Sequence, residues 1–172
     1  KNTFIRLVAL GAFPLILIMI GGRDFFSVIF GSQWSEAGIY AQILAPWILF
    51  VFLGSPLSTL FSVLEMQGIG LFFNMILLMT RVASLVVGSL TGSILLALLL
   101  YAGTGTIMWG GLCLYLLSKA GLTIKLLYRD VSKVVIIAAT ALLPIILLKG
   151  CGMQSLYVFI AGCLSALLYY AL

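Results

Sequence analysis

Six long apolar runs constrain the fold of this chain more than any other feature of its sequence. They cover residues 3–21, 37–64, 69–90, 93–118, 133–148 and 154–172. Each run is longer than a typical strand and none alternates strictly between polar and apolar residues, so each is predicted to be a helix. A membrane-spanning helix satisfies its own backbone hydrogen bonds and needs about 20 mostly apolar residues. We therefore expect an all-α, polytopic membrane bundle of about six transmembrane helices.

The composition excludes a soluble globular domain and several kinds of active site. Of the 172 residues, 64% are hydrophobic and 8% are charged, whereas a soluble domain is about half apolar and about a quarter charged. The chain has no histidine, and its three cysteines and four acidic residues are scattered. A zinc site, a Ser-His-Asp triad and a disulfide framework all lack their residues. We expect no enzyme activity, no bound metal and no cofactor.

The basic residues predict orientation in the membrane and do not indicate nucleic-acid binding. The net charge is +5, but the cations are few and lie between apolar runs, unlike a nucleic-acid footprint. Six fall on the side that holds the N-terminus, namely Lys1, Arg6, Lys119, Lys125, Arg129 and Lys133, and two fall on the other, Arg23 and Lys149. The positive-inside rule then places both ends of the chain in the cytoplasm.

Two connections between the runs are predicted to lie at the membrane surface. Residues 22–36 hold a cluster of aromatic side chains that suits a short interfacial helix. Residues 119–132 lead into a basic pattern, with Lys125, Arg129 and Lys133 four positions apart beside several leucines. This pattern predicts a basic interfacial helix or an extension of the preceding span.

Four prolines lie inside the predicted spans, and each removes a backbone donor and is expected to kink its helix. They are Pro14, Pro46, Pro56 and Pro144. Transporters use such interruptions where a helix bends, but proline is also common in membrane helices. A functional and a purely structural interpretation both stay open.

Arg81 is the most informative single residue, because it falls near the middle of the run 69–90. A charge at that depth costs at least about 2.5 to 3.5 kcal/mol, so it is expected to face away from lipid. It belongs to a stripe of polar and small residues at helical spacing, namely Gln67, Gly70, Asn74, Arg81, Ser84 and Gly88. Two interpretations stay open. Arg81 binds an anionic group such as a phosphate, or the stripe packs against another helix and Arg81 pairs with carbonyl groups.

Two further patterns fall within the spans. Ser55, Ser58, Ser62 and Glu65 are expected on one face of the helix over 37–64, where Glu65 either couples to a cation or proton or is simply solvated. The glycines of the run 93–118 are interpreted as packing positions. They do not form a phosphate-binding loop, because no Lys-Ser or Lys-Thr follows them.

One stretch resembles a known family of transporters. Residues 30–47 read FGSQWSEAGIYAQILAPW, and residues 54–58 read GSPLS. Together with the mid-span Pro14, these segments resemble, in order and spacing, the oligosaccharide flippases, also called polysaccharide biosynthesis proteins or O-antigen exporters. These flippases form part of the multidrug/oligosaccharidyl-lipid/polysaccharide exporter superfamily. The resemblance covers about residues 6–133 and is strongest over residues 30–67.

The resemblance implies part of a two-lobed transporter. Residues 1–118 would be the last four helices of the second lobe, residues 119–132 a basic cytoplasmic connection, and residues 133–172 an additional C-terminal transmembrane pair. About eight preceding helices, including the N-terminal lobe, would be missing. This agrees with a chain that begins at Lys1 and not at methionine.

The family is thought to move a polyprenyl-pyrophosphate-linked oligosaccharide across the bacterial cytoplasmic (inner) membrane, by alternating access around a cationic cavity. The implied function is thus a flippase of polysaccharide or O-antigen biosynthesis. Its partners would be the lipid-linked oligosaccharide, membrane lipids and the missing N-terminal lobe, with no nucleic acid. The implied substrate-binding residues are Arg81 and Asn74, followed by Gln42, Ser55 and Glu65.

Three other functions are weighed against the flippase. A multidrug cation antiporter of the same superfamily would want acidic residues at mid-span, and the sequence places none there. A membrane enzyme acting on polyprenyl phosphates would need clustered carboxylates or histidines. A non-transporting scaffold of a polysaccharide assembly complex would have no need of Arg81.

Overall fold

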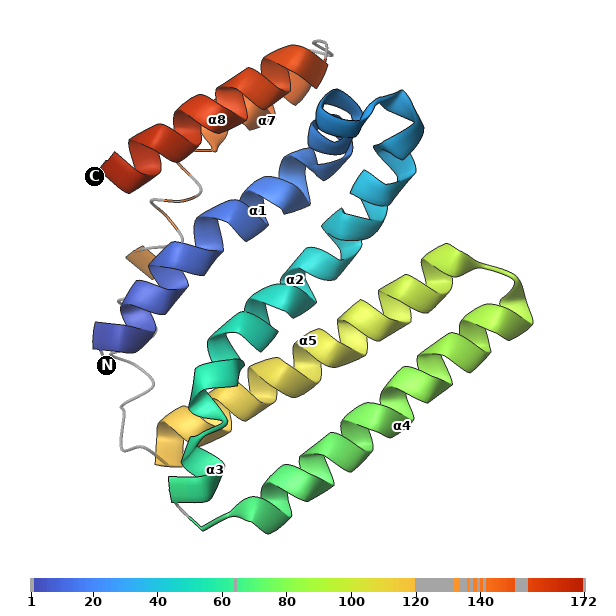
Figure 1. The fold of residues 1–172 in the computed structure, drawn as a ribbon, viewed down its shortest axis with the longest axis vertical. Coiled ribbons are helices and arrows are strands. Elements are labelled where there is room, and N and C mark those ends of the chain that lie inside the picture. Colours follow the sequence, from blue (N-terminus) through green and yellow to red (C-terminus); the bar gives the residue numbers. More distant parts are fainter. Residues whose placement is uncertain are drawn as a thin grey trace. The chain divides into compact units, whose positions relative to one another are not determined.

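The computed structural model is all-α over the residues that it describes, which are 2–63, 65–119, 132–133, 136, 138, 140, 142–150 and 155–171. Four segments are long and apolar enough to span a membrane (Figure 1), namely Val8–Phe30, Ser32–Val63, Gln67–Thr91 and Ile94–Lys119. The predicted all-α membrane fold is confirmed. The chain divides into two compact units, Lys1–Pro46 with Tyr128–Leu172, and Trp47–Leu127.

The first helix is longer than the sequence predicted. α1 runs from Asn2 to Phe30, so the prediction of a separate interfacial helix within 22–36 is wrong. The chain turns only at Gly31, whose φ of 101° favours glycine, and a short 3-10 helix, η1 (Ser32–Trp34), follows. Gly22, the first residue of the predicted connection 22–36, stays helical.

Gly22 is a point of close contact between α1 and the start of α2 (Ser35–Leu57). A Cβ added to Gly38 on α2 would lie 2.5 Å from the carbonyl oxygen of Gly22. Next to this contact, the side-chain amide of Gln42 donates a hydrogen bond to the carbonyl oxygen of Met19 at 2.8 Å. The two helices therefore touch backbone to backbone, as small residues allow in membranes.

The C-terminal helix packs against α1 in the opposite direction. α8 (Ser155–Ala171) places its last turn beside the first third of α1, where the Tyr169 hydroxyl donates to the carbonyl oxygen of Ala9 at 2.9 Å. At the other end of α8, the Ser155 hydroxyl donates to the Asp24 carboxylate at 3.0 Å. The two helices are antiparallel neighbours (Figure 1).

The core of this unit lies between α1, α8 and α7 (Leu143–Gly150). Phe13 of α1 is 1% exposed and stacks on the Tyr169 ring with the centroids 4.6 Å apart. Ile145 of α7 and Val158 of α8 are buried in the same cluster. Pro144 stands in the first turn of α7, where a missing backbone donor costs little. Burial of these apolar side chains holds the three helices together.

In the second unit, the helix predicted over 37–64 is interrupted. α2 ends at Leu57, and a single short turn, α3 (Leu60–Val63), follows. Pro56 lacks a backbone donor, and the hydroxyls of Ser58 and Thr59 donate to the carbonyls of Ser55 and Pro56 at 2.6 and 2.8 Å. These side chains satisfy carbonyl groups at the helix end, so the expected continuous face from Ser55 to Glu65 does not form.

The clearest element of the second unit is the antiparallel hairpin of α4 (Gln67–Thr91) and α5 (Ile94–Lys119), seen in Figure 1. Gly92 ends α4 with a φ of 64°, and the Ser93 hydroxyl accepts a hydrogen bond from the backbone N–H of Leu96. A left-handed glycine followed by a serine N-cap is a typical sharp turn between helices.

Part of the sequence prediction falls outside the described residues. The basic helix expected around Lys125 and Arg129 lies there, and so does the Lys1 end. The span expected over 133–148 is described only in part, with α7 as its clearest portion. The division into lobe helices, connection and terminal pair stays a prediction.

Candidate functional site

Arg81 lies near the middle of a membrane-spanning helix. At 1.5 Å per residue it stands about 21 Å from the Gln67 end of α4 and about 15 Å from the Thr91 end. Of the stripe predicted on this helix, the small residues Gly70, Ser84 and Gly88 are buried, and Arg81 is half-buried. Gln67 and Asn74 of the same stripe are exposed, so the predicted face packs against protein only in part.

Two aromatic rings from neighbouring helices receive the Arg81 side chain. Its guanidinium carbon lies 5.5 Å from the ring centroid of Trp47 on α2 and 5.4 Å from that of Tyr101 on α5. The two rings meet edge to face, with centroids 5.1 Å apart and an interplanar angle of 87°. All three residues belong to the second unit. We call Trp47, Arg81 and Tyr101 the arginine–aromatic cluster.

The cluster explains how a charge can remain at this depth. Placing an arginine at the bilayer centre costs about 2.5 to 3.5 kcal/mol on an insertion scale. Each cation–π contact returns between about 0.5 and 2 kcal/mol, so two rings together return about 1 to 4 kcal/mol, which is comparable with that cost. Arg81 is thus stabilised at this depth by aromatic rings and not by a carboxylate among the described residues.

The hydrogen-bonding groups of Arg81 are unused within the part of the chain that the structure describes. There its recorded interactions are the two ring contacts, with no hydrogen bond and no salt bridge. The ring faces of Trp47 and Tyr101 stabilise the positive charge but accept no hydrogen bond from the five N–H donors. A charged, planar guanidinium whose N–H donors are unused is suited to bind a phosphate or a carboxylate.

Gly105 on α5 makes the space that Trp47 occupies. A Cβ at position 105 would lie 2.5 Å from Cδ1 of the Trp47 ring. The indole N–H of Trp47 is buried and has no hydrogen-bond partner among the described residues. The position of this ring is therefore set by packing against Gly105 and by Arg81.

We expect Gly105→Val to displace Trp47 and so disrupt the cluster. Overpacking of this kind costs about 1 to 3 kcal/mol, and the Trp47 fluorescence maximum should shift. Gly103→Val is the matched control on the same helix, because no atom lies within 4 Å of the Cβ it adds. Thermal unfolding of the purified variants checks this prediction. Equal unfolding temperatures for the two would contradict it.

The other predicted site residues do not gather around Arg81. Asn74 is exposed on α4 and donates its side-chain amide to the Gly70 carbonyl at 2.9 Å. Ser55 is exposed near the end of α2. Glu65 is exposed in the turn before α4 with a φ of 55°, and it therefore does not lie on a helical face with Ser55.

Gln42 belongs to the first unit and has a structural contact. Its side-chain amide donates to the carbonyl oxygens of Met19 and Ile20, at 2.8 and 3.2 Å. Both bonds reach from α2 to α1 within that unit. The amide thus fastens one helix to the other at the contact of Gly22 with Gly38.

Comparison with known proteins gives no match among family models, curated proteins or solved structures. Its function has to be argued from its own residues.

Two members of the cluster, Trp47 and Tyr101, were not predicted. Tyr101 carried a signal, because in a hairpin that turns at Gly92 the positions 81 and 101 lie at similar depths on antiparallel helices. Trp47 carried none, since the sequence does not say which face of α2 meets the hairpin. Among the described residues, no three His, Cys, Asp or Glu side chains come together as a metal site would require.

Proposed function

We propose that this chain is part of a transporter that moves a polyprenyl-pyrophosphate-linked oligosaccharide across the bacterial cytoplasmic membrane by alternating access. The observation that carries the proposal is Arg81, held at mid-span by Trp47 and Tyr101 with its N–H donors unused within the described part of the chain. Intramembrane charges of this kind mark substrate pathways in membrane proteins.

The chemistry of the substrate matches that of the cluster. A pyrophosphate presents several anionic oxygens, and a guanidinium binds two of them at once through parallel N–H bonds. The aromatic rings stabilise the arginine's positive charge before the substrate arrives. A substrate that brings its own negative charge lowers the cost of the buried cation, so binding and neutralisation occur together.

The alternatives fit the cluster less well. A multidrug cation antiporter needs a carboxylate where its cationic substrate binds, and the recorded partners of Arg81 in the described part of the chain are two aromatic rings. A non-transporting scaffold would not need an arginine at mid-membrane depth. An enzyme acting on polyprenyl phosphates would need acidic or histidine side chains beside the charge.

Reconstitution of the complete protein into liposomes tests the proposal. A fluorescent lipid-linked oligosaccharide is placed in one leaflet, and its arrival in the other is followed with an impermeant lectin. We expect protein-dependent translocation, and slower translocation of the same glycan on an uncharged polyprenyl ether. Equal rates for the two lipids, or efflux of a cationic dye in place of lipid movement, would contradict the flippase.

A further inference from the structure

A polar cavity of about 300 Å³ lies at the end of α1 that meets η1 and the first turn of α8, all within the first unit. Its described lining residues are all charged or hydroxyl-bearing, in a chain of which 64% is hydrophobic. The lining residues are Arg23, Asp24, Ser27, Ser32, Ser35 and Ser155. Nothing in the flippase proposal uses this cavity.

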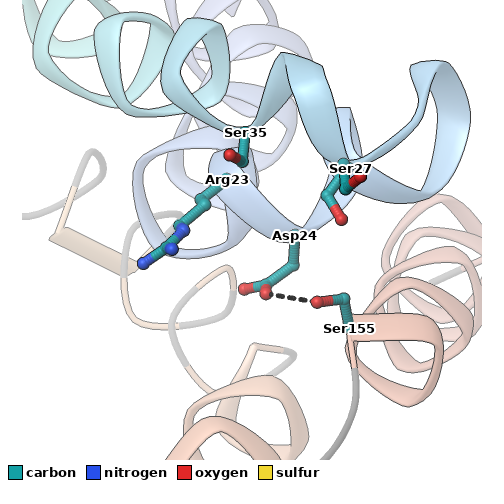
Figure 2. Close-up of a pocket in the computed structure, with 6 residues that line it drawn as sticks. Arg23, Asp24, Ser27, Ser35 and Ser155 are labelled. Atoms are coloured by element: carbon teal, nitrogen blue, oxygen red, sulfur yellow. Dashed lines mark hydrogen bonds between the residues drawn. The ribbon is translucent and has the colours of Figure 1, made fainter.

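Among the described lining residues, one cationic and one anionic side chain are consecutive in sequence. Arg23 and Ser155 stand on opposite sides of the Asp24 carboxylate in Figure 2, and the Ser155 hydroxyl donates to that carboxylate at 3.0 Å. Arg23 is exposed and makes no salt bridge or hydrogen bond within the described residues. Consecutive helical residues do not face each other, so the two charges present separate points of attachment.

The length of α1 indicates that the cavity lies near the depth of the lipid headgroups. α1 has 29 residues, or about 44 Å at 1.5 Å per residue, which matches a bilayer with its headgroups, about 40 to 45 Å thick. Asp24 is about 9 Å from the Phe30 end of α1, close to the inner edge of the headgroup layer. Phe26, Phe30 and Trp34 form a chain of ring contacts beside it, as in the aromatic belt of membrane proteins.

We propose that this cavity binds the headgroup of a zwitterionic phospholipid with a primary ammonium group, that is, phosphatidylethanolamine. Arg23 and the serine hydroxyls bind the phosphate oxygens. The Asp24 carboxylate, oriented by Ser155, accepts a hydrogen bond from the ammonium group. The volume is at the lower end of the range for ligand sites, which suits one headgroup and not an oligosaccharide.

The proposal predicts a preference among lipids that differ in one group. Phosphatidylcholine keeps the phosphate but replaces the ammonium N–H donors with methyl groups, and phosphatidylglycerol lacks the cation. The loss of one charge-assisted hydrogen bond corresponds to about tenfold weaker binding. Phosphatidylethanolamine should therefore be retained about tenfold more than either of the other two lipids.

Native mass spectrometry measures how much of each lipid the complete protein retains. The protein is reconstituted in vesicles of equal parts of the three lipids and then released in mild detergent. We expect Asp24→Asn to abolish the preference for phosphatidylethanolamine over phosphatidylcholine, and Arg23→Gln to reduce retention of all three lipids. The control substitutions are Glu36→Gln and Arg6→Gln, which alter exposed charges outside the cavity and should leave retention unchanged.

Three outcomes would overturn the proposal. Equal retention of the three lipids by the wild type would show a non-selective surface. An Asp24→Asn variant that unfolds at the wild-type temperature but keeps the preference would show that Asp24 does not receive the ammonium. If free phosphoethanolamine stabilises the protein against heat as strongly as the vesicle lipid does, the cavity serves a soluble ligand and the assignment to a lipid is wrong.

Discussion

Replacing Arg81 with leucine in the complete protein is expected to reduce glycan export about ten- to hundredfold while leaving the amount of folded protein unchanged. The loss corresponds to the removal of one charge-assisted contact with the pyrophosphate, worth about 1.5 to 3 kcal/mol. The folded protein should not suffer, because leucine also removes a cation whose placement at mid-membrane costs about 3 kcal/mol. Export is measured as surface glycan per molecule of transporter.

The unchanged protein level separates this role of Arg81 from a structural one. If the arginine served only to hold Trp47 and Tyr101, the leucine variant would lose stability and export in parallel. Arg6→Leu is the control, because Arg6 is an exposed arginine in the first unit. Arg81→Lys should keep the charge and part of the activity, since lysine lacks the bidentate fork. Full export by Arg81→Leu would contradict the account.

Gly38→Val is expected to have the largest effect on stability. The added Cβ would lie 2.5 Å from the carbonyl oxygen of Gly22 and 2.6 Å from Cα of Arg23. Both are backbone atoms and cannot rotate away, so α2 has to separate from α1 and the bonds from Gln42 are lost. We expect the free energy of unfolding to fall by about 3 kcal/mol, the upper end for overpacking, and the protein to accumulate poorly.

The matched control for this substitution is Gly68→Val. Gly68 lies in the first turn of α4, and no atom lies within 4 Å of the Cβ it would gain. Accumulation in membranes and the midpoint of thermal unfolding compare the two variants. If Gly38→Val unfolds at the same temperature as Gly68→Val, the close contact of α1 with α2 does not contribute to stability.

Much of the fold could be predicted because lipid restricts the backbone to a few solutions. The run 69–90 predicted α4 (Gln67–Thr91), and the run 93–118 predicted α5 (Ile94–Lys119), each to within a few residues. α4 ends before Gly92, which has a positive φ, and α5 begins after Ser93, whose hydroxyl accepts a hydrogen bond from the backbone. Helices of this kind depend on length, apolar content and end residues, which are all visible in a sequence.

The end of the first helix was predicted wrongly because a glycine can either turn the chain or make room for a neighbouring helix. Glycine at position 22 looked like a break in α1, but its missing side chain is used for contact with Gly38. The chain was expected to leave the first span before residue 22, but α1 ends only at Phe30, where Gly31 turns the chain with a positive φ. Only the partner helix distinguishes a packing glycine from a turning one.

Of the residues in the arginine–aromatic cluster, only Arg81 could be predicted from the sequence. Arg81 was identifiable because its burial in lipid is costly, whereas Asn74 and Gln42 bond to nearby backbone carbonyls. Trp47 could not be found, because its contact with Arg81 depends on how α2 meets α4. The polar cavity was missed as well, since Asp24 was expected in a separate interfacial helix and lies in α1.

The most direct test of the central claim is a comparison of two ligands on the complete protein in detergent. One is a short polyprenyl pyrophosphate, and the other is the matching polyprenyl alcohol, which lacks the charged group. We predict that the wild type binds the pyrophosphate at least about tenfold more tightly than the alcohol, and that Arg81→Leu binds both alike. An Arg81→Leu protein that keeps the full preference for the pyrophosphate would contradict the account.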